Sequence, residues 1–277
     1  MYFGLSEEQQ FFQESINKFL EDNVTVDALK AYRTGENKVL TKTVYNGLNE
    51  LGLSSLIVPE AFGGLGLDSL FAISVSESLG KGVAPYPFIG SFLIAPFLID
   101  QLGNESQKEK YLPGIATGEN RFGVALSEIT GRRIDSSIEY SKQRLNGSSL
   151  FVMDDIECTH YLIVDSDAGV HIIDASNMNL ERVHLNTVDV TSFVSELIFN
   201  GIETEVLNND SDNIEIVNQA IDLGRISLAA KTLGAAQCML DQSIEYAKER
   251  KQLGGGGGGV RAVKHMCAQM ASDLEPC

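Results

Sequence analysis

The sequence has few of the residues that build disulfide frameworks or metal centres. Its four cysteines are scattered along the chain, with no closely spaced pair that would suggest a redox motif. They are Cys158, Cys238, Cys267 and Cys277. The four histidines, His160, His171, His184 and His265, are equally isolated. None lies in a metal-ligand spacing such as H-E-x-x-H. We therefore expect reduced cysteines that serve packing, and no metal site.

Long hydrophobic runs are also absent. No apolar run reaches the roughly 18 uncharged residues that a membrane-spanning helix needs. The N-terminal residues MYFGLSEEQQ lack the basic start and apolar stretch of a signal peptide. These features predict a protein with no membrane span that resides in the cytoplasm.

Positive charge is scarce. The chain has 21 Lys and Arg against 38 Asp and Glu, which gives a formal net charge of −17. The long-range field of such a protein repels nucleic acid and anionic membrane surfaces, so we exclude both as partners. Any phosphorylated ligand must be held by local groups.

The N-terminal region has the periodicity of helices. A chain of 277 residues is long enough for about two domains. Ser6 followed by Gln9 forms a capping-box start, and apolar residues at helical spacing follow it. Further helices are predicted near 44–51, 69–79 and 92–102. The four helices predict one helical domain over residues 1–120.

The remainder changes character twice. Short strand patterns separated by Asp, Asn, Ser and Gly predict a small antiparallel barrel or sandwich over 121–208. Residues 209–277 predict a long helix toward Arg250 and a second from Val260, which form part of a helical bundle. Six consecutive glycines, Gly254 to Gly259, interrupt it and predict a flexible connection. The fold class is therefore α+β.

Local motifs sharpen this order of domains. The segments LNELGLSSLIVPEAFGGLGLD (48–68), LGNESQKEKYLPGIATGENRFGVALSE (102–128), YAKERKQLG (246–254) and AVKHM (262–266) resemble signatures of the acyl-CoA dehydrogenase family, in the family's order. The resemblance covers essentially the whole chain. It implies an N-terminal all-α domain, a middle antiparallel β-barrel domain that binds flavin, and an incomplete C-terminal helical bundle.

The resemblance also implies FAD as the cofactor and an acyl-CoA thioester as the substrate. A carboxylate base removes the α-proton in this family, and the β-hydrogen leaves as hydride to the flavin. Leu126, Ser127, Phe151 and Met153 match flavin-contacting positions, although Met153 cannot donate a strong hydrogen bond where the family has Thr or Ser. Apart from the resemblance, Ser127 is an ordinary strand hydroxyl and Phe151 a core residue. The arginines at 132–133 either neutralise a phosphate or form an exposed surface pair.

Four further positions match the family's ligand contacts in the bundle. Asp222 and Arg225 correspond to residues that line the acyl-CoA pocket near the thioester. Arg250, with Gln252 beside it, resembles the arginine that reaches the FAD of a neighbouring subunit. The alternative for Arg250 is a solvated helix end.

The catalytic base is missing from both places where the family keeps it. Most members carry a glutamate late in the bundle, beyond the point that matches Cys277, and a minority carry it immediately before the arginine matched by Arg225. That second position is Gly224 here. The resemblance thus implies that the chain stops partway through its C-terminal helical domain. Since loss of a general base costs roughly 10²- to 10⁴-fold in rate, the isolated chain should be nearly inert.

Three hypotheses remain open. The first is part of an FAD-dependent acyl-CoA dehydrogenase whose base comes from a partner subunit or a missing C-terminal segment. The second is a non-catalytic scaffold or interaction subunit of a heteromeric dehydrogenase, and the third is a truncated inactive fragment. The resemblance implies a homo- or hetero-oligomer with another acyl-CoA dehydrogenase-like subunit, and electron transfer flavoprotein as electron acceptor.

Overall fold

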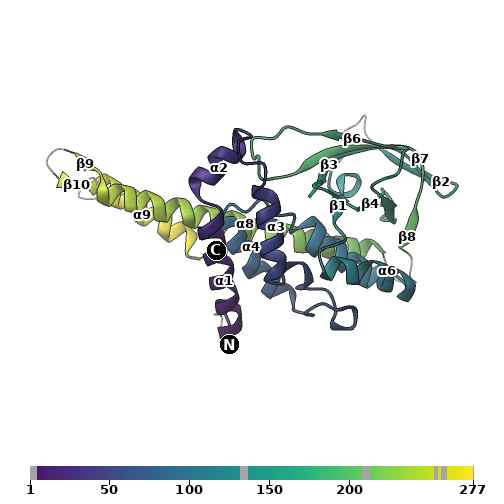
Figure 1. Cartoon of the computed structure of the whole chain (residues 1–277), viewed down its shortest axis with the longest axis horizontal. Helices are drawn as coiled ribbons and strands as arrows, with labels where there is room; N and C mark the ends of the chain where they lie inside the picture. Colours follow the sequence, from purple (N-terminus) through teal and green to yellow (C-terminus); the bar gives the residue numbers. More distant parts are fainter. Residues whose placement is uncertain (1–4, 132–136, 208–212, 253–254, 257–260, 277) are drawn as a thin grey trace.

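The computed structural model describes residues 5–131, 137–207, 213–252, 255–256 and 261–276. Helices dominate up to residue 116, a sheet follows, and helices return from residue 213 (Figure 1). The N-terminal α-helices are α1 (Glu7–Asn23), α2 (Val26–Arg33), α3 (Leu40–Glu50), α4 (Ser69–Lys81), α5 (Ala95–Leu102) and α6 (Glu105–Ala116). Two 3-10 turns, η1 (Leu53–Ser55) and η2 (Glu60–Phe62), and a π-helical turn, η3 (Gly90–Ile94), lie between them.

The predicted start of the first helix is confirmed. The Ser6 side chain accepts a hydrogen bond from the Gln9 backbone N–H, and the Gln9 side chain accepts one from the Ser6 N–H. A second capping box, Asn104 with Gln107, begins α6. The prediction of four helices was incomplete, because it missed α2 and α6. The eight-residue α2 is short and buries no residue, and α6 carries Pro113, a residue that disfavours a helix interior.

The Pro59–Gly64 segment builds the scaffold between α3 and α4. Gly63 has φ +82°, a left-handed conformation that favours glycine. A Cβ atom on Gly64 would lie 1.9 Å from the Val58 carbonyl oxygen, so any other side chain would collide with the backbone. The backbone therefore requires glycine at both positions.

The middle of the chain forms an eight-stranded sheet. Its strands are β1 (Phe122–Ala125), β2 (Ile138–Ser141), β3 (Arg144–Met153), β4 (His160–Val164), β5 (Val170–Asp174), β6 (Leu180–His184), β7 (Val194–Glu203) and β8 (Glu205–Leu207). The strand order is β6-β7-β3-β1-β4-β5-β8, and β2 pairs with β3. The predicted fold class is confirmed, but the sheet is mixed, because β1 and β4 run parallel. The chain passes through α7 (Ser127–Thr130), β2 and β3 between these two strands, which lets β4 return in the direction of β1.

Both faces of the central strands are buried. Leu162 and Val164 of β4 belong to the core shared with the helices, whereas Tyr161 and Ile163 belong to a second core inside the curled sheet. Alternate residues of one strand thus serve two different cores, which explains why its sequence is continuously apolar. The sheet is thereby fixed against the helical layer along one face.

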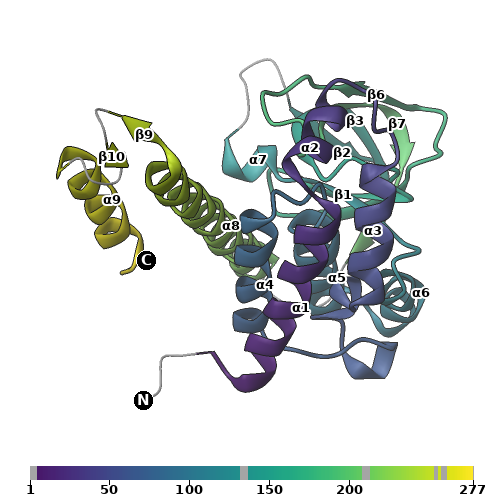
Figure 2. The same ribbon diagram turned by 60° about the vertical axis from the view of Figure 1, so that its left-hand side comes forward.

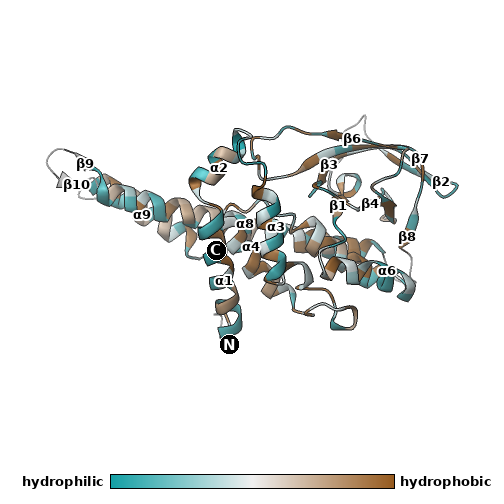
Figure 3. Ribbon diagram, viewed as in Figure 1, coloured by the Kyte–Doolittle hydropathy of each residue, from teal (hydrophilic) through white to brown (hydrophobic). Residues whose placement is uncertain are grey.

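The long helix α8 (Asn213–Glu249) packs closely against α4. A Cβ atom on Gly80 would lie 1.8 Å from the Lys231 carbonyl oxygen, and one on Gly234 would lie 1.9 Å from the Glu77 carbonyl oxygen. These glycines let the two backbones approach each other. Apolar residues concentrate around α4 and α5, where the N-terminal core lies (Figure 3). None of the described helices is both long and apolar enough to cross a membrane.

The predicted long helix toward Arg250 and the second helix after it are confirmed. The distal part of α8 extends beyond the body, and α9 (Arg261–Leu274) lies beside it (Figures 1 and 2). Two short strands, β9 (Lys251–Gln252) and β10 (Gly255–Gly256), pair between these helices. The other residues of the glycine run lie outside the described residues. The domain limits at 120 and 208 stay predictions.

Candidate active site

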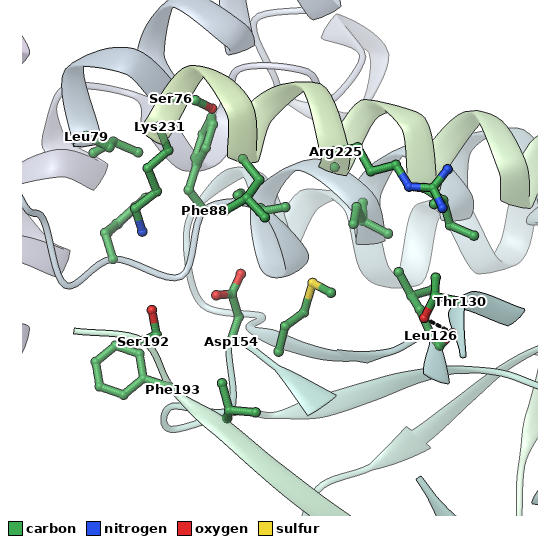
Figure 4. Close-up of a pocket in the computed structure, with 18 residues that line it drawn as sticks. Ser76, Leu79, Phe88, Leu126, Thr130, Asp154, Ser192, Phe193, Arg225 and Lys231 are labelled. Atoms are coloured by element: carbon green, nitrogen blue, oxygen red, sulfur yellow. Dashed lines mark hydrogen bonds between the residues drawn. The ribbon is translucent and has the colours of Figure 1, made fainter. Parts of the chain in front are cut away.

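A cavity of about 400 Å³ lies where the helical layer meets the sheet. Its walls come from α4, from the segment 86–94, from the ends of β3 and β7, and from one face of α8 (Figure 4). On α8 the lining residues are Ile221, Gly224, Arg225, Leu228 and Lys231, which recur at helical spacing. The cavity therefore collects side chains from three parts of the chain that are far apart in sequence.

One end of the cavity opens to solvent at Arg225. Arg225 lines the cavity, yet its side chain is 68% exposed. Its guanidinium donates a hydrogen bond to Asp222 Oδ1 at 2.9 Å, one helical turn away. The two residues predicted to contact substrate thus lie together at this opening, with Leu126 and Thr130 across from them (Figure 4). An isolated surface ion pair stabilises the fold little, so this pair remains available for ligand contact.

Gly224 faces the cavity between Arg225 and the deeper residues of α8. It is buried, and a Cβ atom placed on it would lie 2.9 Å from Ile94 Cδ1 and 3.6 Å from Ile89 Cγ2. Both neighbours are ends of apolar side chains, not backbone atoms. A longer side chain at this position would therefore extend into the cavity after a small shift of Ile94.

Asp154 is a cavity residue that the sequence reasoning missed. Its Oδ2 atom accepts hydrogen bonds from the backbone N–H of Gly90 at 2.6 Å and of Ser91 at 3.2 Å, at the start of η3. Burial raises the pKa of Asp154, and these hydrogen bonds and the charge of Lys231 oppose the rise only in part. Its sole sequence signal was its place directly after Met153. Among the described residues that line the cavity, Asp154 is the one carboxylate.

Lys231 was also missed, although the helical spacing of α8 could have found it. It lies seven residues after Gly224, which places both on the same face of the helix. Lys231 is half-buried, and its side chain points into the space between α8 and the sheet (Figure 4). Ser192 lines the same end of the cavity. Its hydroxyl donates to Asp189, whose carboxylate also accepts from Thr191.

The predicted flavin residues Leu126 and Ser127 lie at the turn from β1 into α7. Leu126 is buried and lines the cavity, whereas Ser127 is buried and does not line it. The Ser127 hydroxyl is 2.8 Å from the Ser149 hydroxyl, and either can be the donor. One of the two therefore keeps a hydrogen atom for another acceptor. The sequence predicted Ser127 as a site residue but did not predict its partner Ser149.

The predicted positions Phe151 and Met153 sit at an irregularity of β3. The pairing of β3 with β7 shifts register between Ser149 and Val152, and Phe151 adopts φ +58°. Its side chain is 61% exposed, so it is not the core residue that the alternative interpretation described. Met153 lines the cavity. A bulky residue in this conformation is strained, and such strain concentrates at functional sites.

The remaining predicted residues lie away from the cavity or cannot be described. Arg250 directly follows the end of α8, on the part that extends from the body, where its guanidinium contacts the Tyr246 hydroxyl and lies 5.4 Å from the Tyr246 ring centre. Gln252 has its backbone in β9. Residues 132–133 lie outside the described residues. In the described ranges, no three His, Cys, Asp or Glu side chains come together in a way that could hold a metal ion.

Known proteins share this fold. Two family models match the chain: Acyl-CoA dehydrogenase, N-terminal domain, at residues 6–119, and Acyl-CoA dehydrogenase, C-terminal domain, at residues 214–276. A solved glutaryl-coenzyme A dehydrogenase glutaryl-CoA complex aligns with a TM-score of 0.86 at 25% identity, over 100% of this chain and 75% of that one. The chain belongs to the acyl-CoA dehydrogenase family.

Its relatives differ in what they act on. An acyl-CoA dehydrogenase of Bacillus subtilis (strain 168) is 27% identical over 98% of this chain and 76% of its own length. The caffeyl-CoA reductase-Etf complex subunit CarC of Acetobacterium woodii is 26% identical over 99% of this chain and 77% of its own length. The names of these two relatives describe a dehydrogenase and a subunit of a reductase complex, so membership of the family does not by itself give the reaction or the acyl group.

The residues at the irregular end of β3 fit a flat aromatic cofactor. Phe151 presents an exposed ring on a strained backbone, and rings of this kind stack on other aromatic systems. The paired hydroxyls of Ser127 and Ser149 leave one donor beside the buried Leu126. Met153, at the cavity wall, supplies an apolar contact where a hydroxyl would supply a hydrogen bond. The fit to FAD is good for stacking and weaker for hydrogen bonding.

Proposed function

We propose that the chain binds FAD and an acyl-CoA thioester and contributes to FAD-dependent α,β-dehydrogenation. One observation supports the proposal above all others: the cavity places the predicted flavin contacts Leu126 and Met153 opposite the α8 face that carries Gly224 and Arg225. A thioester between these two walls would have its acyl group in the cavity. Its CoA portion would leave through the solvent-open end at Arg225.

Each side chain has a role in this arrangement. Phe151, Ser127 and Met153 would hold the flavin ring, which when bound supplies the hydride acceptor. Arg225, kept in place by Asp222, would orient the thioester end at the opening. The apolar walls exclude water from the carbon atoms that react. By the family resemblance, Arg250 and Gln252 would reach the FAD of a neighbouring subunit in an oligomer.

We further propose that the proton-abstracting carboxylate comes from a partner subunit or from additional sequence. Gly224 has no side chain, and Asp154 has one oxygen engaged by the two backbone N–H groups of η3. Among the described residues, the cavity carboxylate is thus Asp154, which holds the start of η3 in place. The position beside Arg225 carries no carboxylate. Electron transfer flavoprotein is the proposed electron acceptor, in keeping with the family.

Flavin content tests the cofactor part of the proposal. The protein should be expressed alone and with each candidate partner, purified gently and assayed for bound FAD and for acyl-CoA-dependent dye reduction. The proposal expects FAD in both preparations and dye reduction only with the partner. A protein that stays colourless and inactive with every partner would rule it out.

The alternative is a non-catalytic scaffold or interaction subunit. Two observations favour it: Met153 weakens the hydrogen-bonding part of the flavin contacts, and Gly224 leaves the alternative base position empty. A scaffold would associate with a dehydrogenase subunit and would melt cooperatively without any flavin. Stoichiometric FAD in the purified chain would exclude this alternative, whereas a chain without a cooperative melt would be an inactive fragment.

A further inference from the structure

The cavity is not uniformly apolar along its length. Arg225 lies toward one end, and Lys231, Asp154 and Ser192 lie toward the other (Figure 4). Leu126, a predicted flavin contact, lies at the same end as Arg225, a predicted thioester contact. The polar residues therefore lie where the far end of a bound acyl group would arrive.

Lys231 has unused hydrogen-bonding capacity at this end. Among the described residues, no side chain or backbone group forms a hydrogen bond or a salt bridge with its Nζ atom. A lysine ammonium carries three donors, and a half-buried position limits how many of them water can satisfy. The side chain thus presents donors to whatever occupies the cavity.

Asp154 offers the complementary acceptor. Its Oδ2 atom is engaged by Gly90 and Ser91, and no described group donates a hydrogen bond to its Oδ1 atom. Lys231 lies near enough for its charge to act on Asp154. A donor-bearing residue and an acceptor-bearing residue consequently face the same space from opposite walls.

From this pair we infer that the acyl group of the substrate carries a hydroxyl at the end remote from the thioester. A hydroxyl accepts one hydrogen bond and donates another, so it can accept from Lys231 Nζ and donate to Asp154 Oδ1 at once. The inference rests on the proposed function, because it takes the cavity as an acyl-CoA site. It assigns Lys231 and Asp154 as specificity-determining residues.

Other acyl ends fit these residues less well. A methyl end would displace water from both polar groups and leave them unpaired, which costs more than the hydrogen bonds return. A carboxylate would pair with Lys231, but Asp154 would repel it. Asp189, whose carboxylate also interacts with the charge of Lys231, would add to this repulsion. An ammonium would be repelled by Lys231. Of these four end groups, the neutral hydroxyl is the one that satisfies both walls.

Calorimetric titration of the FAD-loaded full chain tests the inference. The ligands are butyryl-, hexanoyl- and octanoyl-CoA, each in a methyl-ended, a hydroxyl-ended and a carboxylate-ended form. At the best chain length, the hydroxyl-ended ligand should bind at least about tenfold more tightly than the methyl-ended one, since hydrogen bonds to charged groups are the strong ones. Lys231→Met, which keeps the apolar stem, should remove this preference.

The control is Lys248→Met, because Lys248 lies on the same helix, outside the cavity, in an exposed pair with Glu245. It should leave the preference unchanged. Equal binding of the three forms, tightest binding of the carboxylate, or a preference that survives Lys231→Met would overturn the inference while the proposed function stands. If no acyl-CoA binds the FAD-loaded chain at all, the proposed function fails and the inference fails with it.

Discussion

Placing a carboxylate at Gly224 tests whether a base is the one group that the cavity needs for proton abstraction. Gly224 lies in the interior of α8 and faces the cavity immediately before Arg225. In Gly224→Glu, the new Cβ atom would meet Ile94 Cδ1 at 2.9 Å, so the Ile94 side chain must shift by a few tenths of an ångström. The carboxylate would then extend toward the α-carbon of a thioester held at Arg225.

The substitution should change the unfolding free energy little and the rate of proton abstraction greatly. Replacing an interior helical glycine gains up to about 1 kcal/mol in helix propensity, which offsets the contact with Ile94 and part of the cost of a half-buried carboxylate. The unfolding free energy should therefore change by less than about 1 kcal/mol. Removal from water raises the pKa of a carboxyl toward the range in which it is an effective base. We expect proton abstraction to become about 10²- to 10⁴-fold faster.

Exchange of the α-protons of a bound acyl-CoA in D₂O, followed by NMR, measures this step without requiring an electron acceptor. Gly224→Gln is the matched control, because it has the same shape and no base, and Gly224→Ala isolates the helix-propensity change. The expected order is fast exchange for the glutamate variant and wild-type exchange for the other two. If a folded Gly224→Glu protein that binds acyl-CoA exchanges no faster than Gly224→Gln, the assignment of this cavity as the thioester site is wrong.

Three further substitutions probe the flavin edge, the helix contact and the acid response. Phe151→Ala should weaken FAD binding severalfold and change the unfolding free energy by less than about 1 kcal/mol, because the ring is 61% exposed; flavin titration and a denaturant melt measure the two effects. Gly234→Ala should destabilise the protein by about 1–3 kcal/mol, since its Cβ would lie 1.9 Å from the Glu77 carbonyl oxygen; a urea melt measures this. Burial acts to raise the pKa of Glu205. The hydrogen bonds that it accepts, the largest effect among them coming from Lys110 Nζ, outweigh burial and bring this pKa below its ordinary value of 4.5. Its stabilisation is complete above pH 4.5 and is lost as the pH falls through the lowered pKa, so Glu205→Gln should reduce the loss of stability in acid, measured by melts from pH 7 downward.

Each of these substitutions has a matched control. Tyr140→Ala removes an exposed ring of β2 that does not line the cavity and should leave FAD affinity unchanged. Thr232→Ala changes an exposed residue near Gly234 and should be nearly neutral. Glu203→Gln removes a 76% exposed carboxylate paired with Arg144 and is the control for the acid melts. Equal effects in a test variant and its control would contradict the reasoning in each case.

The sequence predicted those helices and strands that are determined by residues close together in the chain. The Ser6 capping box determines where α1 begins, whatever the rest of the chain does, and the apolar run of β4 reflects burial on both faces. The π-helical turn η3 escaped prediction, because the run from residue 92 reads as ordinary helix. Its start is held by Asp154, which comes from a different part of the chain. Tertiary contacts of this kind leave no periodic pattern in the sequence.

The same distinction separates the predicted site residues from the missed ones. Motif resemblance located Met153 and Arg225, which the structure brings to one cavity. It did not indicate Lys231, which the helical spacing from Gly224 would have placed on the same face of α8. It could not indicate the exposure of Phe151, because the register shift in β3 that turns this ring outward depends on pairing with β7.

The amount of FAD bound per chain tests the central claim most directly. The full chain should be saturated with FAD, freed of unbound flavin, and measured for flavin absorbance against protein concentration, with and without added acyl-CoA. The proposed site predicts close to one FAD per chain, and a change in the flavin spectrum when acyl-CoA enters the adjoining cavity. A protein that melts cooperatively yet holds no FAD under any of these conditions would contradict it.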